Sequence, residues 1–233
     1  MSAYTTPNDD AILADMLRQS ERLCQSADAL LVGQYRHLQD RIRALMTDGT
    51  LGRLAHVEGQ FSVPIPETNI RFDWSLAGGA TMDLGCYPLH MIRYFSGLMP
   101  RVVSARAETG PKNIDIAMEV DLELAGGVTA KMTCAMKKDS PLRASFMACG
   151  ELGELRVTNP IAPHRGHQLI VKTGAREKTE TVPGDTTFTH QLRAFIKAAR
   201  GEAKFPTDGS EGIINMRVID DVYRAAGLPP RAT

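Results

Sequence analysis

Residues 116–136 read IAMEVDLELAGGVTAKMTCAM, and this stretch decides which fold we expect. Two strand-like runs, Ile116 to Leu124 and Val128 to Met136, flank the short connection Ala125-Gly126-Gly127. A glycine pair between two such runs is typical of a β-hairpin, because glycine adopts the left-handed backbone conformations that tight hairpin turns require. The strands of a hairpin are antiparallel, so the stretch predicts an antiparallel sheet.

Further strand-like runs lie on either side of this hairpin and are separated by turn signals. Gly150-Glu151-Leu152-Gly153 predicts another tight reversal between two of them. The runs are Leu54 to Val63, Val102 to Ala107, Leu142 to Cys149, Leu155 to Thr158, Gln168 to Thr173 and Lys178 to Val182.

Two amphipathic helices are predicted after the last strand. Strands followed by helices in this way are typical of α+β proteins. We therefore predict an α+β domain with an open, mainly antiparallel sheet of about six strands and helices on one face. The apolar stripes of the two helices are Phe188, Leu192, Phe195 and Ala199 in the first and Ile214, Val218, Val222 and Ala225 in the second.

The first 50 residues follow a different pattern. Asp9 to Ala27 and the residues before Gly49 have apolar side chains at helical spacing, and Ala29 to Val32 reads as a short buried strand. Helix, strand, helix is the order at the edge of a doubly wound sheet, but one strand and two helices cannot form such a sheet. We interpret residues 1–50 as a remnant of a Rossmann unit and residues 51–233 as the α+β domain.

Composition narrows the function. The chain has 233 residues, 27 basic and 27 acidic side chains and 43% hydrophobic residues, which is the profile of a soluble globular protein. Because the formal net charge is zero, we expect neither nucleic acid nor an anionic membrane surface as a partner, since both require a basic footprint. No apolar run approaches the roughly 20 residues of a membrane span. No export signal is visible, so we expect a cytoplasmic protein.

Sequence motifs for metal and phosphate binding are not found. Cys24, Cys86, Cys134 and Cys149 form no Cys-x-x-Cys pair and have apolar neighbours, which predicts buried thiols and no metal site. Neither Gly-x-Gly-x-x-Gly nor the P-loop pattern occurs. No cofactor-binding residue is therefore assigned.

The segment from Gly78 to Phe95 is the best candidate for chemistry. If it is a helix, Asp83, Tyr87 and His90 follow one line along its surface, apart from the residues that pack. A carboxylate, a phenol and an imidazole in one row suit proton transfer. The alternative is a partly solvated helix face on which His90 is a structural residue, and spacing alone does not distinguish the two.

The same segment, Gly78 to Phe95, resembles the signature helix of the Gfo/Idh/MocA family of NAD(P)-dependent oxidoreductases, in particular the branch of dihydrodiol dehydrogenase and glucose-fructose oxidoreductase. The similarity extends through Asp48 to Gly59, Asn69 to Trp74, Gln191 to Phe195 and Ile219 to Gly227. Nearly the whole chain is covered.

The resemblance implies a domain order. Family members place a Rossmann domain first, followed by an open sheet that binds substrate and usually mediates oligomerisation through its free face. Residues 1–50 are similar to the end of the first domain, and residues 51–233 to the second. The family's glycine-rich turn and catalytic lysine are then expected before Met1. NAD(P) is the implied cofactor, although we expect no binding by this chain alone.

The resemblance also implies roles for five residues. Tyr87 matches the proton donor or acceptor, and Asp83 matches the acid that orients it. Arg71, Trp74 and His90 are expected neighbours in a pocket for a sugar-like or dihydrodiol-like molecule. Because an unperturbed tyrosine titrates near 10, such a phenol needs a nearby cation, which the family supplies as the lysine.

Two partner hypotheses follow. We interpret strands such as Leu122 to Met136 as apolar on both faces, which predicts a homodimer through the sheet face. The apolar strand Ala29 to Val32 predicts pairing with another chain, for example a separate nucleotide-binding chain. The competing functions are a dimeric non-redox binding module and a cofactor-independent lyase or isomerase that uses Asp83, Tyr87 and His90.

Overall fold

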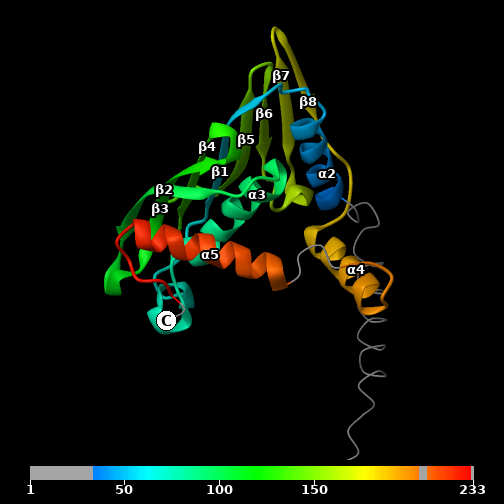
Figure 1. The fold of residues 1–233 in the computed structure, drawn as a ribbon. Helices are drawn as coiled ribbons and strands as arrows, with labels where there is room; N and C mark the ends of the chain where they lie inside the picture. The colour runs from blue at the N-terminus through cyan, green and yellow to red at the C-terminus, as the bar shows by residue number, and fades with distance from the viewer. Residues whose placement is uncertain (1–33, 205–208, 232–233) are drawn as a thin grey trace, which may run out of the picture.

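The computed structural model describes residues 34–204 and 209–231, which form eight strands and four α-helices (Figure 1). The predicted helix Asp9 to Ala27 and the predicted strand Ala29 to Val32 lie outside the described residues. The assignment of a Rossmann remnant to residues 1–50 therefore stays a prediction.

The eight strands form one sheet in the order β2-β3-β4-β1-β5-β6-β7-β8. Neighbouring strands are antiparallel except β1 and β4, which are parallel. The α+β class and the mainly antiparallel sheet are thereby confirmed, and β3 and β4 form the predicted hairpin. The strands are β1 Leu54–Ser62, β2 Arg101–Thr109, β3 Asp115–Leu124, β4 Val128–Ala135, β5 Arg143–Gly150, β6 Gly153–Thr158, β7 Gln168–Thr173 and β8 Arg176–Glu180.

The sheet is wider, with eight strands, than the sequence predicted. All eight strand-like runs of the sequence belong to it, including those of the two edge strands, β2 and β8, where most side chains are exposed. An edge strand is held by backbone hydrogen bonds to one neighbour and needs few apolar residues. Edge strands therefore count toward the width of an open sheet even where their side chains are exposed.

The helices that cover the sheet lie on one face, as predicted. α3 (Cys86–Ser96) contacts β1 and β4, and α5 (Gly209–Ala225) contacts β2 and α3 (Figure 1). α2 (Gln34–Thr47) lies beside α3 and contacts α4 (Thr187–Ala199). The helix predicted before Gly49 is thus confirmed as α2.

A bidentate ion pair fastens α2 to the edge of the sheet. Nε and Nη2 of Arg41 each donate to the carboxylate of Glu180 on β8, at 3.0 Å in both cases. Because these hydrogen bonds favour the ionised carboxylate, the pKa of Glu180 falls to about 2. The pair therefore keeps its charges at neutral pH and binds α2 to the sheet, although the sequence assigned α2 to the preceding domain.

The strands of the central hairpin are apolar on one face only, so our interpretation of two apolar faces was wrong. In β3, Met118 and Val120 are buried whereas Glu119 and Asp121 are exposed. The large apolar residues between Leu122 and Met136 all have even numbers, and the three-residue connection keeps them on one side of the sheet. The homodimer itself stays a prediction that now needs another basis.

The apolar stripe predicted for α4 is also wrong in part. Phe188 is 75% exposed and Phe195 is 49% exposed, whereas Thr189 and Ile196, one position later, are buried. The helix exists where it was predicted, but the residues that pack against the protein follow the predicted ones by one position along the helix. On α5, Val218 and Val222 are buried as predicted.

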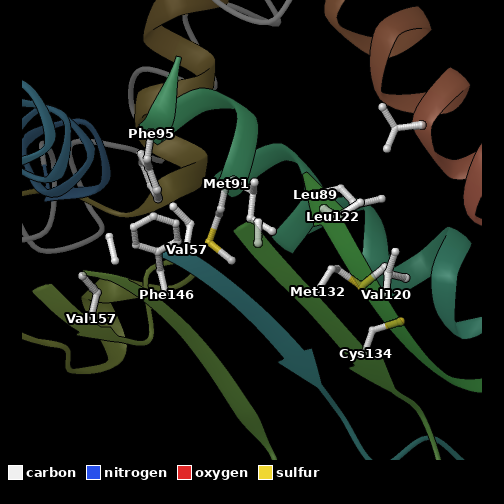
Figure 2. Packing of buried hydrophobic residues seen from close by; sticks show 14 of the residues in the cluster. Val57, Leu89, Met91, Phe95, Val120, Leu122, Met132, Cys134, Phe146 and Val157 are labelled. Atoms are coloured by element: carbon white, nitrogen blue, oxygen red, sulfur yellow. The ribbon is translucent and has the colours of Figure 1, made fainter. Parts of the chain in front are cut away.

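The segment predicted as one helix has two geometries. Thr81–Gly85 forms a π-helical turn (η3), and α3 continues from Cys86. Pro88 lacks an N–H group, so it donates no backbone hydrogen bond to the preceding turn. That preceding turn is the one in which the wider π-helical turn ends. Figure 2 shows α3 directing Met91 and Phe95 toward Val57 and Phe146 of the sheet. The rings of Phe95 and Phe146 meet edge to face, with centroids 4.8 Å apart.

A buried ion pair lies where η3 begins. Asp115 of β3 and Arg231, near the end of the chain, are 2.6 Å apart, and both side chains are fully buried. Gly79 has φ of +138°, and a Cβ atom there would lie 2.2 Å from Oδ1 of Asp115. The buried carboxylate therefore requires glycine at this position.

We predict that Gly79→Ala lowers the free energy of unfolding by about 3 kcal/mol, because the methyl group collides with Asp115 and the backbone conformation is strained. Gly126→Ala is the matched control, since its φ is +81° with no atom within 4 Å of the added Cβ. We expect a cost of about 1 kcal/mol there. Chemical denaturation measures both, and equal losses would show that the contact with Asp115 is unimportant.

Candidate active site

An ion pair joins two of the predicted site residues. Nε of Arg71 lies 2.5 Å from Oδ2 of Asp83, with the side chains 40% and 28% exposed. Arg71 belongs to a short helical turn, η1 (Ile70–Phe72). Its backbone N–H donates a hydrogen bond to Oδ1 of Asn69, which caps this turn. Asp83 lies in the π-helical turn η3. The loop after β1 and the start of the signature helix therefore meet at this pair.

Tyr87 lies on the first turn of α3, close to the same pair. Its side chain is 44% exposed, and its ring contacts Phe61 of β1 edge to face, with centroids 5.2 Å apart. Burial raises the pKa of Tyr87 above its usual value, and the Cys86 thiol and the Asp83 carboxylate add to the shift, whereas Arg71 opposes it. The phenol therefore holds its proton at neutral pH.

His90 follows Tyr87 on α3 but contacts a different group. Its ring stacks on Tyr94 at 5.5 Å with an interplanar angle of 22°, and the guanidinium of Arg43 lies 4.7 Å from the centre of the Tyr94 ring. Burial and the charge of Arg93 lower the pKa of His90, so its imidazole is neutral at neutral pH. A role for His90 toward substrate stays a prediction.

Trp74 lies on η2 (Trp74–Leu76), and one face of its ring is occupied. The guanidinium of Arg231 lies 3.9 Å from the ring centre, a cation–π contact. The indole therefore packs on the buried ion pair, and only its remaining surface is open to a substrate. The structure thus brings Arg71, Asp83 and Tyr87 together, whereas Trp74 contacts Arg231.

Sequence reasoning missed the buried residues behind the site, Asp115, Tyr223 and Arg231. Asp115 and Arg231 are 116 positions apart, and neither belongs to a recognisable motif. The sequence offers one signal, the pair Gly78-Gly79, because glycine lets another group approach the backbone closely. The approaching group is the carboxylate of Asp115.

The cysteines of the described part are free thiols: Cys86, Cys134 and Cys149. Burial and the Asp83 carboxylate raise the pKa of Cys86 to about 11, so it is not a thiolate nucleophile at neutral pH. Residues 34–204 and 209–231 contain no group of three or more His, Cys, Asp or Glu side chains that could hold a metal ion. In the same residues, no helix has the length and apolar character of a membrane span.

The described residues also lack a strand, a glycine-rich turn and a helix in succession, which is the cradle that a dinucleotide pyrophosphate requires. The chemistry present is a protonated phenol beside a carboxylate and a guanidinium. Such a group suits proton transfer to or from a hydroxyl or carbonyl oxygen.

Comparison with known proteins gives a family match. Residues 40–156 match the model of the GFO/IDH/MocA C-terminal domain. The chain is 29% identical to D-xylose 1-dehydrogenase (NADP(+)) 2 of Haloferax volcanii, with 87% of this chain and 64% of the relative covered. It is 30% identical to the trans-1,2-dihydrobenzene-1,2-diol dehydrogenase of Bos taurus, with 81% of this chain and 58% of the relative covered. The chain thus spans about 60% of the length of these relatives.

Solved structures have the same fold. The aldose-aldose oxidoreductase of Caulobacter crescentus superposes with a TM-score of 0.75 at 23% identity, over 91% of this chain and 67% of that one. A 3-ketoreductase of Actinomadura kijaniata, in complex with NADP and TDP-benzene, superposes with a TM-score of 0.74 at 20% identity, over 90% of this chain and 67% of that one. At such identities the likeness concerns the fold alone.

Titration of Tyr87 tests the geometry of the site. We predict that its pKa lies above the ordinary value of about 10, that Asp83→Asn lowers it and that Arg71→Gln raises it further. The ultraviolet absorbance of tyrosinate, taken as the difference between each protein and its Tyr87→Phe counterpart, isolates this one phenol.

Asp121→Asn and Arg106→Gln are the matched controls, because they make the same changes of charge on the outer face of the sheet. We expect neither to move the pKa of Tyr87. A shift as large as that of the site variants would mean that net charge, rather than the Arg71–Asp83 pair, sets the titration.

Proposed function

The chain belongs to the Gfo/Idh/MocA family, and we propose that it is the substrate-binding and catalytic part of an NAD(P)-dependent oxidoreductase acting on a sugar-like or dihydrodiol-like molecule. The observation that carries the proposal is the protonated, half-exposed phenol of Tyr87 beside the Arg71–Asp83 ion pair. D-xylose and dihydrodiol dehydrogenases among the relatives support the substrate class.

The proposed role of Tyr87 is to exchange a proton with a substrate oxygen. In the direction of reduction, Oη donates its proton to a carbonyl oxygen that becomes a hydroxyl. In the direction of oxidation, the tyrosinate accepts the proton of a substrate hydroxyl. Asp83 holds Arg71 near the phenol, and Arg71 favours the tyrosinate that each turnover forms.

The proposed oxidoreductase activity requires that a part beyond the described residues binds the dinucleotide cofactor. A nicotinamide dinucleotide accepts or donates a hydride when it is bound. The described residues do not provide its pyrophosphate cradle, so we propose that a nucleotide-binding part outside them, or in a second chain, holds the dinucleotide. That part is also the proposed source of the catalytic lysine.

We also propose that a second copy of the chain covers the outer face of the sheet. This face has a shallow hollow of about 300 Å³. Its polar lining resembles the mixed composition of non-obligate interfaces rather than an apolar core. A stable monomer at micromolar concentration in size-exclusion chromatography with light scattering contradicts this proposal. The lining consists of Glu58, Gly59, Gln60, Lys131, Thr133, Ser145 and Met147.

The competing hypothesis of a cofactor-independent lyase or isomerase depends on Asp83, Tyr87 and His90 acting together. The stacking of His90 on Tyr94 gives this row no support, because the imidazole is engaged one turn further along the helix. A non-redox binding module stays an outcome of the experiments below rather than a second proposal.

Turnover measurements test the proton donor. With a nucleotide-binding chain of the same family supplied, we predict that Tyr87→Phe lowers kcat by a factor of about 10²–10⁴ in the oxidation of an aldose or a trans-dihydrodiol, followed through the absorbance of reduced nicotinamide. Tyr94→Phe is the matched control, since it removes a hydroxyl from the same helix and keeps the ring that His90 stacks on. Full activity of Tyr87→Phe would remove this residue from the mechanism.

Isothermal titration tests the condition on the cofactor. We predict no micromolar binding of NADP(H) or NAD(H) to the 233-residue chain by itself, because the cradle for the pyrophosphate is not in its described part. Adding a nucleotide-binding chain of the same family is expected to restore binding and turnover together. Micromolar binding by the isolated chain contradicts the need for a second part.

A further inference from the structure

The carboxylate of Asp115 is fully buried and receives three hydrogen bonds. The backbone N–H of Thr81 donates to Oδ2 at 2.7 Å, and the hydroxyl of Tyr223 donates to Oδ1 at 3.0 Å. Nη2 of Arg231 donates to the same Oδ1 at 2.6 Å. Three donors from three distant parts of the chain thus converge on one carboxylate at the start of η3.

Arg231 in turn holds the loop that precedes η3. Its Nε donates to the carbonyl oxygen of Gly78 at 2.8 Å, and its guanidinium lies between the rings of Trp74 and Tyr223, 3.9 Å and 4.4 Å from their centres. The chain after α5 runs back to the segment before α3 to make these contacts (Figure 1). The segment after α5, which carries Arg231, therefore packs directly behind the candidate site.

The two contacts fix the backbone on both sides of Gly79. Arg231 holds the carbonyl of Gly78, and Asp115 holds the amide of Thr81. The amide of Gly79 donates to the carbonyl oxygen of Arg71 at 3.0 Å. Because Asp83 follows Thr81 by only two residues, this arrangement determines where Arg71 and Asp83 meet.

Stability alone is a poor reason for such a pair. Removing two charges from water costs about as much free energy as their attraction returns, and apolar residues of similar volume often stabilise a protein equally well. Buried ionic groups are instead suited to select one arrangement among several compact ones. The network here selects the arrangement of the loop that carries Arg71.

We propose that Asp115 and Arg231 are positioning residues, which set the geometry of the Arg71–Asp83 pair around Tyr87 from behind the site. Neither touches a substrate, and both act through the backbone of residues 78–81. The proposal rests on the proposed function for its catalytic consequence, whereas its geometric content is independent of any activity.

The test uses Arg231→Lys, which keeps the positive charge. It removes the planar guanidinium that donates hydrogen bonds to Asp115 and to the carbonyl oxygen of Gly78 at the same time. Trp74 is the single tryptophan of the chain, so its fluorescence reports directly on the ring beside Arg231. We expect a red shift of the Trp74 emission in the folded variant. We also expect the pKa of Tyr87 to fall toward its ordinary value, as the loosened loop lets water reach the phenol.

Tyr223→Phe is the second variant, because it removes one donor to Asp115 and keeps the packing of the ring. It serves as the test if Arg231→Lys fails to fold. We expect shifts of the same sign and smaller size. Arg224→Lys is the matched control, since it makes the same substitution on the exposed side of α5 and is expected to change neither signal.

In turnover with a nucleotide-binding chain of the same family supplied, Arg231→Lys is expected to lower kcat about tenfold or more with little change in KM for the cofactor. Lowered stability with unchanged Trp74 emission and unchanged Tyr87 pKa in both folded variants would overturn the proposal, because a merely structural pair has that signature. If both signals move but Tyr87→Phe keeps full activity, the proposed function fails while the positioning role stands.

Discussion

A carboxylate that has no access to water must find its hydrogen-bond donors inside the protein, and for Asp115 these donors come from three elements. Thr81 lies at the start of the signature helix, Tyr223 lies on α5, and Arg231 follows α5. Satisfying this one group therefore fixes α5 and the chain end against the sheet and the loop. Each donor compensates part of the buried charge, so the loss of any one of them weakens the packing of these elements around Asp115.

The same constraint explains the unusual backbone before the site. Gly79 is needed because the carboxylate occupies the space where a side chain would lie, and the π-helical turn begins two residues later, at Thr81. Wider turns of this kind often occur at functional sites, where they change the direction in which side chains point. Here the turn carries Asp83 to Arg71, while α3 continues with Tyr87 exposed at its first turn. On the positioning role proposed above, the geometry of the Arg71–Asp83 pair follows from how a buried charge is satisfied.

The sequence predicted the local features and missed the long-range ones. Strand patterns, the hairpin at Ala125-Gly126-Gly127 and the helices were predictable because each depends on neighbouring residues. The pairing of Asp115 with Arg231 was not, because no local pattern joins residues 116 positions apart. The exposed Phe188 on α4 shows a second limit: periodicity identifies an apolar stripe, but the contacts of the folded protein decide whether that stripe is covered. Helical spacing predicted Asp83 and Tyr87 in one row, the family resemblance added Arg71, and the fold brings the three together.

The charges around Tyr87 affect how proton transfer at this residue depends on the nucleotide-binding part of the protein. Burial and the Asp83 carboxylate both hold the phenol in its neutral form, and Arg71 opposes them only in part, since the pKa stays above the usual value. The site as described therefore retains a proton and has little tendency to release one at neutral pH. A further cation near Oη would shift this balance toward proton exchange. If that cation is the lysine of the nucleotide-binding part, proton transfer is efficient only when the dinucleotide-binding part is in place. Proton transfer without hydride transfer would then be suppressed by electrostatics, with no moving element required.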